Sequence, residues 1–471
     1  MRRRLALIAV GAAAAALAVP APALAHGLVG RADLPIPSWL FGWAAAVVLI
    51  VSFVGLATLW PRPRLQEPRL RRLFYTPAAI EVVCGLIGVF LFALVVYAGL
   101  RGTQTATANL APTFIYVHFW VGLVVLSVLF GDVFRLFNPW LAIGRAVSWV
   151  AGKTIGTQEG DALAYPSWLG RWPAVAGLLG FAWLELAYVN RDDPSTLAIL
   201  SLGYALVQLV GMGLFGVETW SRRGDAFGVY YGMLSRLSPF ERREGVLYLR
   251  PPLSGAPRLD AEIPGTLAVV LTAIGTTTFD GFSSGPVWRK LEPHLSSFWS
   301  NLGADPAHAL QWSFTLGLFA VVLLVCSFYW LGIRGMHSID EKNSTRELAR
   351  RFAHTLIPIA FAYALAHYFS LLIYQGQAAA YLASDPLGHG SNLFGTANKG
   401  IDYGVITATG IWYVQVGALV VGHVSGLILA HDRAVAMYRD VREATRSQYW
   451  MLVVMIGFTS LGLWLLSAIN Q

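Results

Sequence analysis

One apolar segment, 352–376, carries polar side chains whose types and spacing suit chemistry. Tyr363, His367, Ser370 and Tyr374 follow one another at intervals of four, three and four residues. A helix turns about 100° per residue, so these four side chains share one stripe of it. Imidazole and hydroxyl groups are costly to bury in an apolar segment, which makes them candidates for metal binding or proton transfer.

Three further polar residues fall in, or directly after, other apolar segments at a similar depth. They are His118, Glu185 and Asp280. Imidazoles and carboxylates that leave one position open are the ligands of a catalytic divalent metal ion. We predict His367, His118 and Glu185 as ligands of such an ion, whose identity the sequence leaves open. Asp280 is predicted to be a ligand or the general base, and Tyr374 a hydroxyl that orients the substrate.

Each of these residues also has a plainer interpretation. An intramembrane His can simply hydrogen-bond a neighbouring carbonyl and fix the register of a helix. His354 precedes His367 by 13 residues, which is about 20 Å along a helix, so the two cannot bind one ion. His423 lies in a GxxxG sequence, 422–426. That spacing is typical of close helix packing and favours a structural role.

The elements that must position these side chains are predicted to be membrane-spanning helices. Hydrophobic residues make up 56% of the 471 residues and charged residues 13%, and the mean hydropathy is +0.57. Soluble domains carry about 25% charged residues, so much of this surface is expected to contact the lipid bilayer. Ten apolar runs have the length of a span: 38–60, 78–100, 112–131, 173–189, 196–218, 264–279, 311–333, 352–376, 405–430 and 449–469. The predicted fold class is therefore an all-α, polytopic helical membrane bundle.

The segments around Asp280 suggest an irregular region. The run 264–279 is short and ends in GTTTFDG, which predicts a broken helix, tolerated where it is buried in protein or lines a cavity. The segments 280–310 and 377–404 are predicted to be long outer loops, and loops of that length are often functional. The charged run at 340–351 is predicted to be a solvated helix capped by Asn343 or Ser344.

Residues 1–25 are predicted to be a cleaved signal peptide. Three arginines precede an apolar run, which ends in the small-x-small site Ala23-Leu24-Ala25. Cleavage makes His26 the first residue, and its amine and imidazole together offer a chelate to a metal ion such as copper. The alternative is that His26 merely follows the cleavage site. The mature chain, 26–471, is predicted to form a single polytopic membrane domain.

Basic residues predict the orientation. The connecting segments 61–77, 132–172, 219–263, 334–351 and 431–448 hold 25 Lys and Arg residues, whereas the segments on the other side hold six. Because basic loops stay in the cytoplasm, we expect a multi-pass protein of the cytoplasmic membrane with both mature termini extracytoplasmic. Residues of the basic run 431–433 are expected to anchor a span at the headgroups. The net charge of +8 is thereby explained without a nucleic-acid partner.

Several segments of the mature chain resemble a bacterial membrane-protein family known as fenitrothion hydrolase. They are AHGLVGRADLPIPSWLF, FGDVFRLFNPW, TTTFDGFSSGPVW, HTLIPIAFAYALAHYFSLLIYQGQ, IDYGVITATGIWYVQVGALVVGHVSGL and AHDRA. The resemblance implies hydrolysis of an organophosphate triester, which needs an activated water and a stabilised pentavalent phosphorus. A second His one turn before the position of His367 is common in that family, whereas here Tyr363 or Ala364 occupies that place.

Two classes of function follow. The first is an extracytoplasmically facing, metal-dependent membrane hydrolase of that family type, acting on a small-molecule substrate. The second is a transporter, or a metal- or haem-handling membrane protein, in which the same residues line a path. A hydrolase needs a cavity open on the outer side only, whereas a transporter needs polar residues at several depths and a broken helix in each of two related halves. A subunit that assembles with further copies or with paralogous membrane subunits is a third interpretation.

Overall fold

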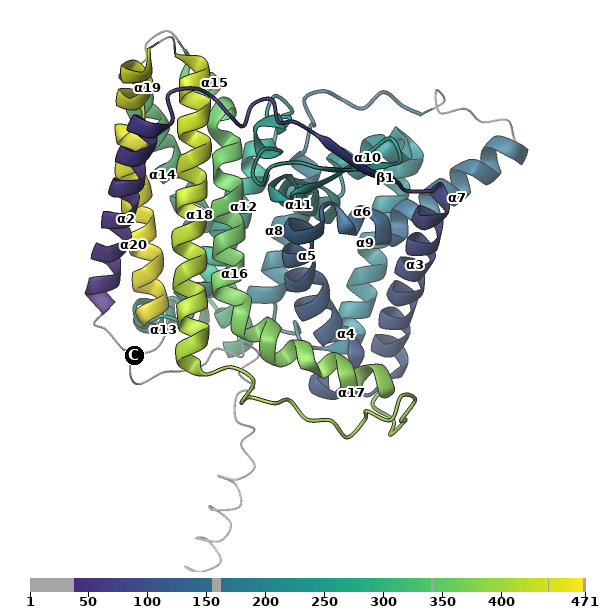
Figure 1. The fold of residues 1–471 in the computed structure, drawn as a ribbon. Helices are drawn as coiled ribbons and strands as arrows, with labels where there is room; N and C mark the ends of the chain where they lie inside the picture. Colours follow the sequence, from purple (N-terminus) through teal and green to yellow (C-terminus); the bar gives the residue numbers. More distant parts are fainter. Residues whose placement is uncertain (1–37, 155–161, 340–342, 439, 469–471) are drawn as a thin grey trace, which may run out of the picture.

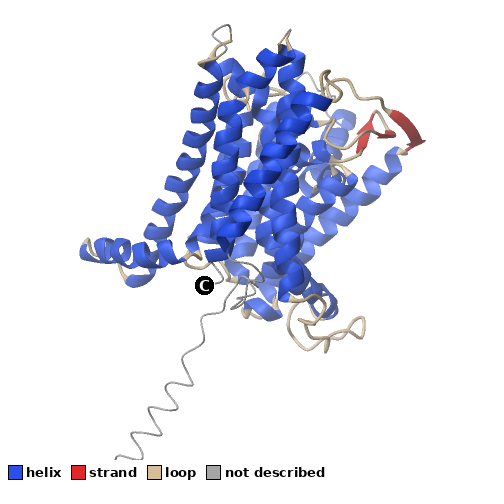
Figure 2. Cartoon of the chain, turned by 60° about the vertical axis from the view of Figure 1, so that its left-hand side comes forward, coloured by secondary structure: helices blue, strands red, loops and turns tan. Residues whose placement is uncertain are grey.

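The molecule is a bundle of upright helices (Figures 1 and 2). The computed structural model describes residues 38–154, 162–339, 343–438 and 440–468. Each of the ten apolar runs is helical over most of its length. The helices are α2 (Ser38–Leu59), α3 (Ala78–Arg101), α4 (Leu110–Thr113) continuing through the π-helical η2 (Phe114–Gly122) into α5 (Leu123–Phe130), α8 (Trp172–Leu186), α9 (Pro194–Phe215), α12 (Thr266–Ser283), α14 (Pro306–His337), α16 (Ile357–Tyr374), α18 (Ala408–Met437) and α20 (Tyr449–Ala468).

A membrane setting fits the lengths and compositions of these helices. In the described part of the chain, six helices are long and apolar enough to cross a bilayer. They comprise α3, α4 to α5, α9, α14, the region Thr345–Ser384 that contains α16, and α18. Shorter apolar helices cover Trp43–Leu59, Trp172–Leu186 and Tyr449–Leu463. The chain is therefore a helical protein with the features of a multi-pass membrane protein.

The connections between the long helices are more structured than the sequence predicted. At the upper end in Figure 1 lie several short helices and a three-stranded antiparallel sheet of order β1-β3-β2. The elements there are β1 (Arg71–Tyr75), α6 (Val133–Phe137), α7 (Pro139–Thr154), α10 (Val217–Arg223), α11 (Ala226–Leu234), η4 (Ser235–Leu237), β2 (Phe240–Arg243), β3 (Val246–Leu249), η5 (Ala256–Arg258), α15 (Thr345–Phe352), η6 (Ala353–Leu356) and α19 (Val441–Ser447). The predicted charged helix is α15, and Ser344 caps it by accepting a hydrogen bond from the amide of Glu347.

The opposite end carries two predicted loops, and one of them is largely helical. The elements are α13 (Pro286–Asn301), η1 (Ala106–Ala108), η7 (Gln375–Ala378) and α17 (Ala379–Ser384). The prediction that 280–310 is a loop is therefore wrong, because α13 fills most of it. The prediction for 377–404 holds beyond Ser384, where no helix or strand is formed up to Asp402.

The predicted break near Asp280 is also wrong. Helix α12 continues through GTTTFDG to Ser283. The hydroxyls of Thr276 and Thr277 donate to the carbonyl of Ala273, one turn back in the same helix. Threonine can satisfy its hydroxyl within a helix in this way, so the polar residues do not end it.

Close packing of α16 on α18 follows from the GxxxG sequence, as predicted. A Cβ placed at Gly422 would lie 2.2 Å from the Cβ of Ala362, and one at Gly426 would lie 2.9 Å from the carbonyl oxygen of Thr355. Larger residues at either glycine would force the two helices apart. This contact fixes α16, the helix that carries His367.

The basic run at the end of α18 does not anchor the helix at the headgroups. His431 and Asp432 are fully buried. The carboxylate of Asp432 accepts hydrogen bonds from the indole of Trp60 at 3.0 Å, from the amide of Arg64 at 2.6 Å and from the side chain of Gln66 at 2.7 Å. This carboxylate therefore fixes the chain that follows α2 against α18.

Asp225 plays a similar part at the same end of the bundle. It is fully buried and accepts hydrogen bonds from the side-chain amide of Asn138 at 2.8 Å, the indole of Trp140 at 2.7 Å and the hydroxyl of Tyr204 at 2.8 Å. Burial raises the pKa of Asp225, although these donors oppose the shift. The segment FGDVFRLFNPW thus has a structural role, because it supplies Asn138 and Trp140.

An ion pair beside the sheet gives a prediction for pH dependence. The buried guanidinium of Arg250 donates to Glu241 at 2.7 Å, and Arg258 donates to the same oxygen at 3.2 Å. Burial alone would raise the pKa of Glu241, but these guanidinium groups and Arg243 outweigh it and lower the pKa below the usual 4.5. The stabilisation from Glu241 is therefore complete above 4.5 and is lost as the pH falls through the lowered pKa of the folded state.

Glu241→Gln is expected to lower the free energy of unfolding near neutral pH by about 1–3 kcal/mol, the range for hydrogen bonds to charged groups. The difference in the free energy of unfolding between the variant and the original protein should shrink in acid, because Glu241 becomes protonated in both the folded and the unfolded state. Melting temperatures in detergent, followed by tryptophan fluorescence, measure this. Glu244→Gln in the exposed turn between β2 and β3 is the matched control, and an unchanged difference down to about pH 3 would contradict the assignment.

Candidate functional site

A buried group of acid–base side chains lies where α12 and α16 meet. The Nε2 atom of His367 is 2.8 Å from Oδ2 of Asp280. The hydroxyl of Tyr368 donates to the same Oδ2 at 2.8 Å. All three residues are no more than 6% exposed. The His367 ring is not aligned for a linear hydrogen bond, so the structure shows a close pair at ion-pair distance.

A second carboxylate belongs to this group. Glu185 in α8 is 5% exposed, and α8 packs on α12, the helix that carries Asp280. Two buried carboxylates on neighbouring helices need cations or protons to balance them. His367 and Arg191 are suited to that task. We call Glu185, Asp280, His367 and Tyr368 the acid–base cluster.

The elements around the cluster explain how it is held. Asp280 lies three residues before the end of α12 and is surrounded by helices on several sides, since α12 packs on α8, α14 and α16. The π-helical segment η2 also packs on α16. Its Trp120 is buried and lies close enough to Tyr368 for their side chains to interact. π-helical turns within longer helices occur frequently at functional sites.

One side of the His367 ring faces a glycine. Nδ1 lies next to Gly281, and a Cβ placed at that glycine would be 3.6 Å from it. Glycine therefore leaves the Nδ1 side of the ring free of a neighbouring side chain at this position. A His that presents one nitrogen to a carboxylate and keeps the other for a reactant has the arrangement of a general base.

No family model, curated protein or solved structure matches this chain. The resemblance to the fenitrothion hydrolase family therefore stays a prediction. The residues proposed to act are inferred from the geometry of the side chains.

The structure places the other predicted site residues away from the cluster. The ring nitrogens of His118 face two backbone carbonyls, those of Thr113 at 3.3 Å and Gly376 at 3.2 Å. The hydroxyl of Tyr374 donates to the carbonyl of Ile406 at 3.0 Å and thus holds the loop before α18. His26 lies outside the described residues, as does the predicted signal peptide. From the predicted set, the structure therefore brings His367 and Asp280 together and buries Glu185 on α8, which packs on α12.

The described candidates for metal ligands face other partners. Among the residues that the structure describes, no group of three or more His, Cys, Asp and Glu side chains is positioned to hold a metal ion. His367 and Asp280 face each other, and His118 faces carbonyls. The divalent metal stays a prediction, which elemental analysis of the detergent-purified protein tests.

Sequence reasoning missed Tyr368, the residue that shares Oδ2 of Asp280 with His367. The polar residues that the spacing singled out in α16 share one stripe, and Tyr368 lies about 100° away from His367 on the helix. The side chains on that stripe are buried, but they contact different neighbouring helices. Tyr363 donates to the carbonyl of Phe458 in α20, whereas His367 faces Asp280 in α12.

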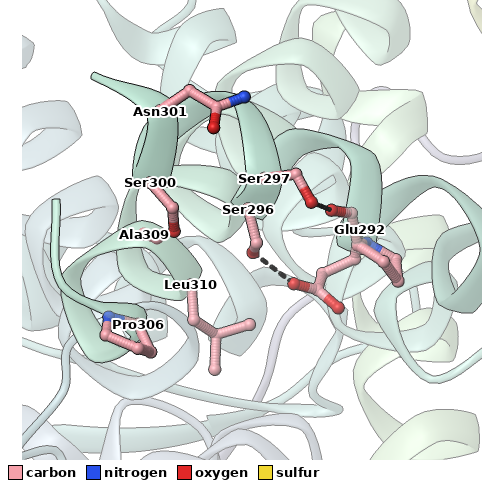
Figure 3. A pocket seen from close by; sticks show the side chains of 9 residues that line it. Glu292, Ser296, Ser297, Ser300, Asn301, Pro306, Ala309 and Leu310 are labelled. Carbon is pink, nitrogen blue, oxygen red and sulfur yellow. Dashed lines mark hydrogen bonds between the residues drawn. The ribbon is translucent and has the colours of Figure 1, made fainter. Parts of the chain in front are cut away.

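Two cavities lie away from the cluster. An open groove of about 520 Å³ separates α13 from α14 (Figure 3), and its one charged lining residue, Glu292, accepts a hydrogen bond from Ser296. A smaller cavity of about 50 Å³ lies among α12, α14, α16, α18 and α20. His423 lines this second cavity. Its Nδ1 is bonded to the carbonyl of Leu419 at 2.8 Å, while its Nε2 is buried without a hydrogen-bond partner in the described part of the chain.

Proposed function

We propose that this protein hydrolyses a phosphoric triester at the acid–base cluster. The observation that carries the proposal is the close pair of His367 and Asp280, with the Tyr368 hydroxyl on the same carboxylate oxygen. A paired and buried His is the type of residue that activates water. The substrate class follows from the resemblance of this chain to the fenitrothion hydrolase family.

The proposed reaction needs one water molecule and the side chains of the acid–base cluster. His367 accepts a proton from water through Nδ1, and the oxygen of that water forms a bond to phosphorus as the bond to the aryloxide leaving group breaks. The proton then passes from His367 to the aryloxide, so the products are a phosphoric diester and a phenol. Asp280, at ion-pair distance from Nε2, stabilises the imidazolium that forms, as carboxylates paired with a catalytic His do. Tyr368 fixes the carboxylate in turn.

Release of a chromogenic phenol from an aryl dialkyl phosphate tests this proposal. The protein, reconstituted in liposomes, should release phenol above the rate of empty liposomes. A rate equal to that of empty liposomes, with folded protein present, would overturn the proposed activity.

The proposed membrane arrangement has ten spans after a cleaved signal peptide, with the basic connections in the cytoplasm. Support comes from the positions of the described connections. The elements of all five basic segments, among them β1, α7, α15 and α19, lie at one end of the bundle in Figure 1, and α13 and α17 lie at the other. A clear separation of basic segments to one end is the pattern of a cytoplasmic face.

Labelling of single cysteines from outside the cell tests the arrangement. In a background in which Cys84 and Cys326 are replaced by Ala, a membrane-impermeant reagent should label Ser297→Cys and leave Glu244→Cys unlabelled until the membrane is opened. Terminal sequencing of the purified protein should begin at His26. Labelling of both positions from the same side would contradict the proposed topology.

The cavity at His423 favours a second candidate, a proton-conducting or transport path. It places an unpartnered imidazole nitrogen at a depth different from that of the acid–base cluster. Water in such a cavity, with His423 and the Thr355 hydroxyl nearby, would extend a polar path along α16. Liposomes that contain a pH-sensitive dye distinguish the two candidates. Under a membrane potential, a proton-conducting path changes the pH of the liposome lumen, whereas a hydrolase does not.

A further inference from the structure

Helix α13 has two faces of opposite character. Val287, Leu291, Phe298 and, just beyond its end, Leu302 recur at the spacing of one helical stripe. Most of the charged and polar residues lie on the other side, although the exposed His294 falls within the stripe, between Leu291 and Phe298. A helix of this kind with a charged polar face is typical of segments that lie in the plane of a membrane surface.

Only part of the apolar face is used within the protein. Trp288 is 3% exposed and packs edge-on against Phe279 at 5.3 Å and Phe314 at 5.3 Å. The adjacent stripe remains uncovered: Val287 is 44% exposed, Leu291 44%, Phe298 55% and Leu302 68%. Four large apolar side chains in one exposed row need an apolar partner.

The position of α13 identifies that partner. The helix lies at the lower end of the bundle in Figure 1 and projects sideways from that end in Figure 2. It packs along the start of α14, to which the Ser296 and Ser313 hydroxyls connect it at 3.2 Å. The exposed apolar surface continues directly into α14, where Trp312 is 47% and Leu316 49% exposed. The uncovered stripe is thus continuous with a surface that has the composition of a lipid-facing one.

We propose that α13 is a membrane-surface helix whose exposed stripe inserts among the acyl chains of the leaflet at that end of the bundle. Arg289 and Lys290, both exposed near the start of the helix, then reach the lipid phosphates. Long cationic side chains at such edges keep their charge in the headgroup region while their stems stay in contact with lipid. The short link from Ser283 to Pro286 joins this helix to α12, so α13 also holds the end of α12 at the membrane surface.

Spin labels on adjacent faces of α13 test the proposal in the reconstituted full-length protein without native cysteines. Leu291→Cys and Phe298→Cys report on the stripe, whereas the matched variants Ser297→Cys and Ser300→Cys report on the polar face. In vesicles of phosphatidylcholine and phosphatidylglycerol, labels on the stripe should be more accessible to oxygen than to a water-soluble nickel chelate. Labels on the polar face should show the opposite order.

Two outcomes would overturn the proposal. Chelate accessibility that is equally high on both faces would place the helix in water. A stripe label shielded from both reagents, with dipolar broadening between labels, would show that a second copy of the chain covers it instead. The readout reports the position of α13 whether or not the acid–base cluster is catalytic, so its failure is separate from failure of the proposed function.

Discussion

Asp280→Asn is expected to reduce triester hydrolysis by at least about 100-fold, the lower limit for loss of general acid–base catalysis. The amide keeps the shape of the side chain, but it no longer balances the imidazolium that forms on His367, 2.8 Å away. His367→Ala should cause a loss of the same order, because it removes the base. The losses should appear in kcat, since neither residue is proposed to bind the substrate in its ground state.

His354→Ala is the control for this pair of variants. His354 is also buried and precedes α16 directly, but it lies in η6, near the opposite end of that region from the cluster. Insertion defects should therefore affect both His variants, whereas the catalytic defect should affect only His367→Ala. Activity is expressed per folded protein, measured by size-exclusion chromatography in detergent. Rates within about twofold of each other for all three variants would exclude the cluster as the catalytic centre.

Gly281→Ala refines the same test. The added methyl group would lie 3.6 Å from Nδ1 of His367, which is ordinary contact and leaves the fold intact. It would occupy the side of the ring from which water is proposed to lose its proton. A reduced rate with an unchanged melting temperature would support Nδ1 as the base, whereas an unchanged rate would move the reaction to another side of the cluster.

The long helices were predictable because apolar runs of membrane-spanning length have few alternatives. The ends of these helices were less predictable, and α12 shows why. GTTTFDG contains glycine, β-branched residues and a carboxylate, all of which favour a break when they are exposed. In the folded chain, Thr278 donates to the carbonyl of Ile274 and Gly275 allows the close approach of Val322. The bond of Thr278 lies within α12 itself, whereas Val322 belongs to α14, and sequence spacing alone could not reveal that this neighbour packs on the helix and lets it continue.

The candidate site was predictable in residue type but only partly in arrangement. Burial of His367, Asp280 and Glu185 was expected from their positions in apolar segments, and the structure buries all three and pairs His367 with Asp280. His118 and Tyr374 occupy comparable depths, yet backbone carbonyls satisfy them. Which polar side chain finds a carboxylate and which finds a carbonyl depends on the rotation of each helix about its axis. Apolar segments exposed to lipid carry weak information about that rotation.

Asp432→Ala is expected to cause the largest loss of stability, about 3 kcal/mol or more, because it leaves several buried donors unsatisfied at once. The carboxylate accepts from the Trp60 indole, from the amides of Arg64 and Leu65 and from the Gln66 side chain. None of these donors gains another acceptor when the carboxylate is removed, and the chain after α2 loses its attachment to α18.

The matched control is Asp440→Ala. Asp440 is exposed and caps α19, where its carboxylate accepts only from the amide of Arg442 at 3.1 Å in the described structure. Loss of such a cap costs about 1 kcal/mol. Melting temperatures in detergent should therefore fall much further for Asp432→Ala than for Asp440→Ala, and cysteines placed in 61–67 should become more reactive only in the former. Equal and small decreases in melting temperature for the two variants would mean that water replaces the carboxylate of Asp432. The segment 61–67 would then be held in place by the helices on either side of it.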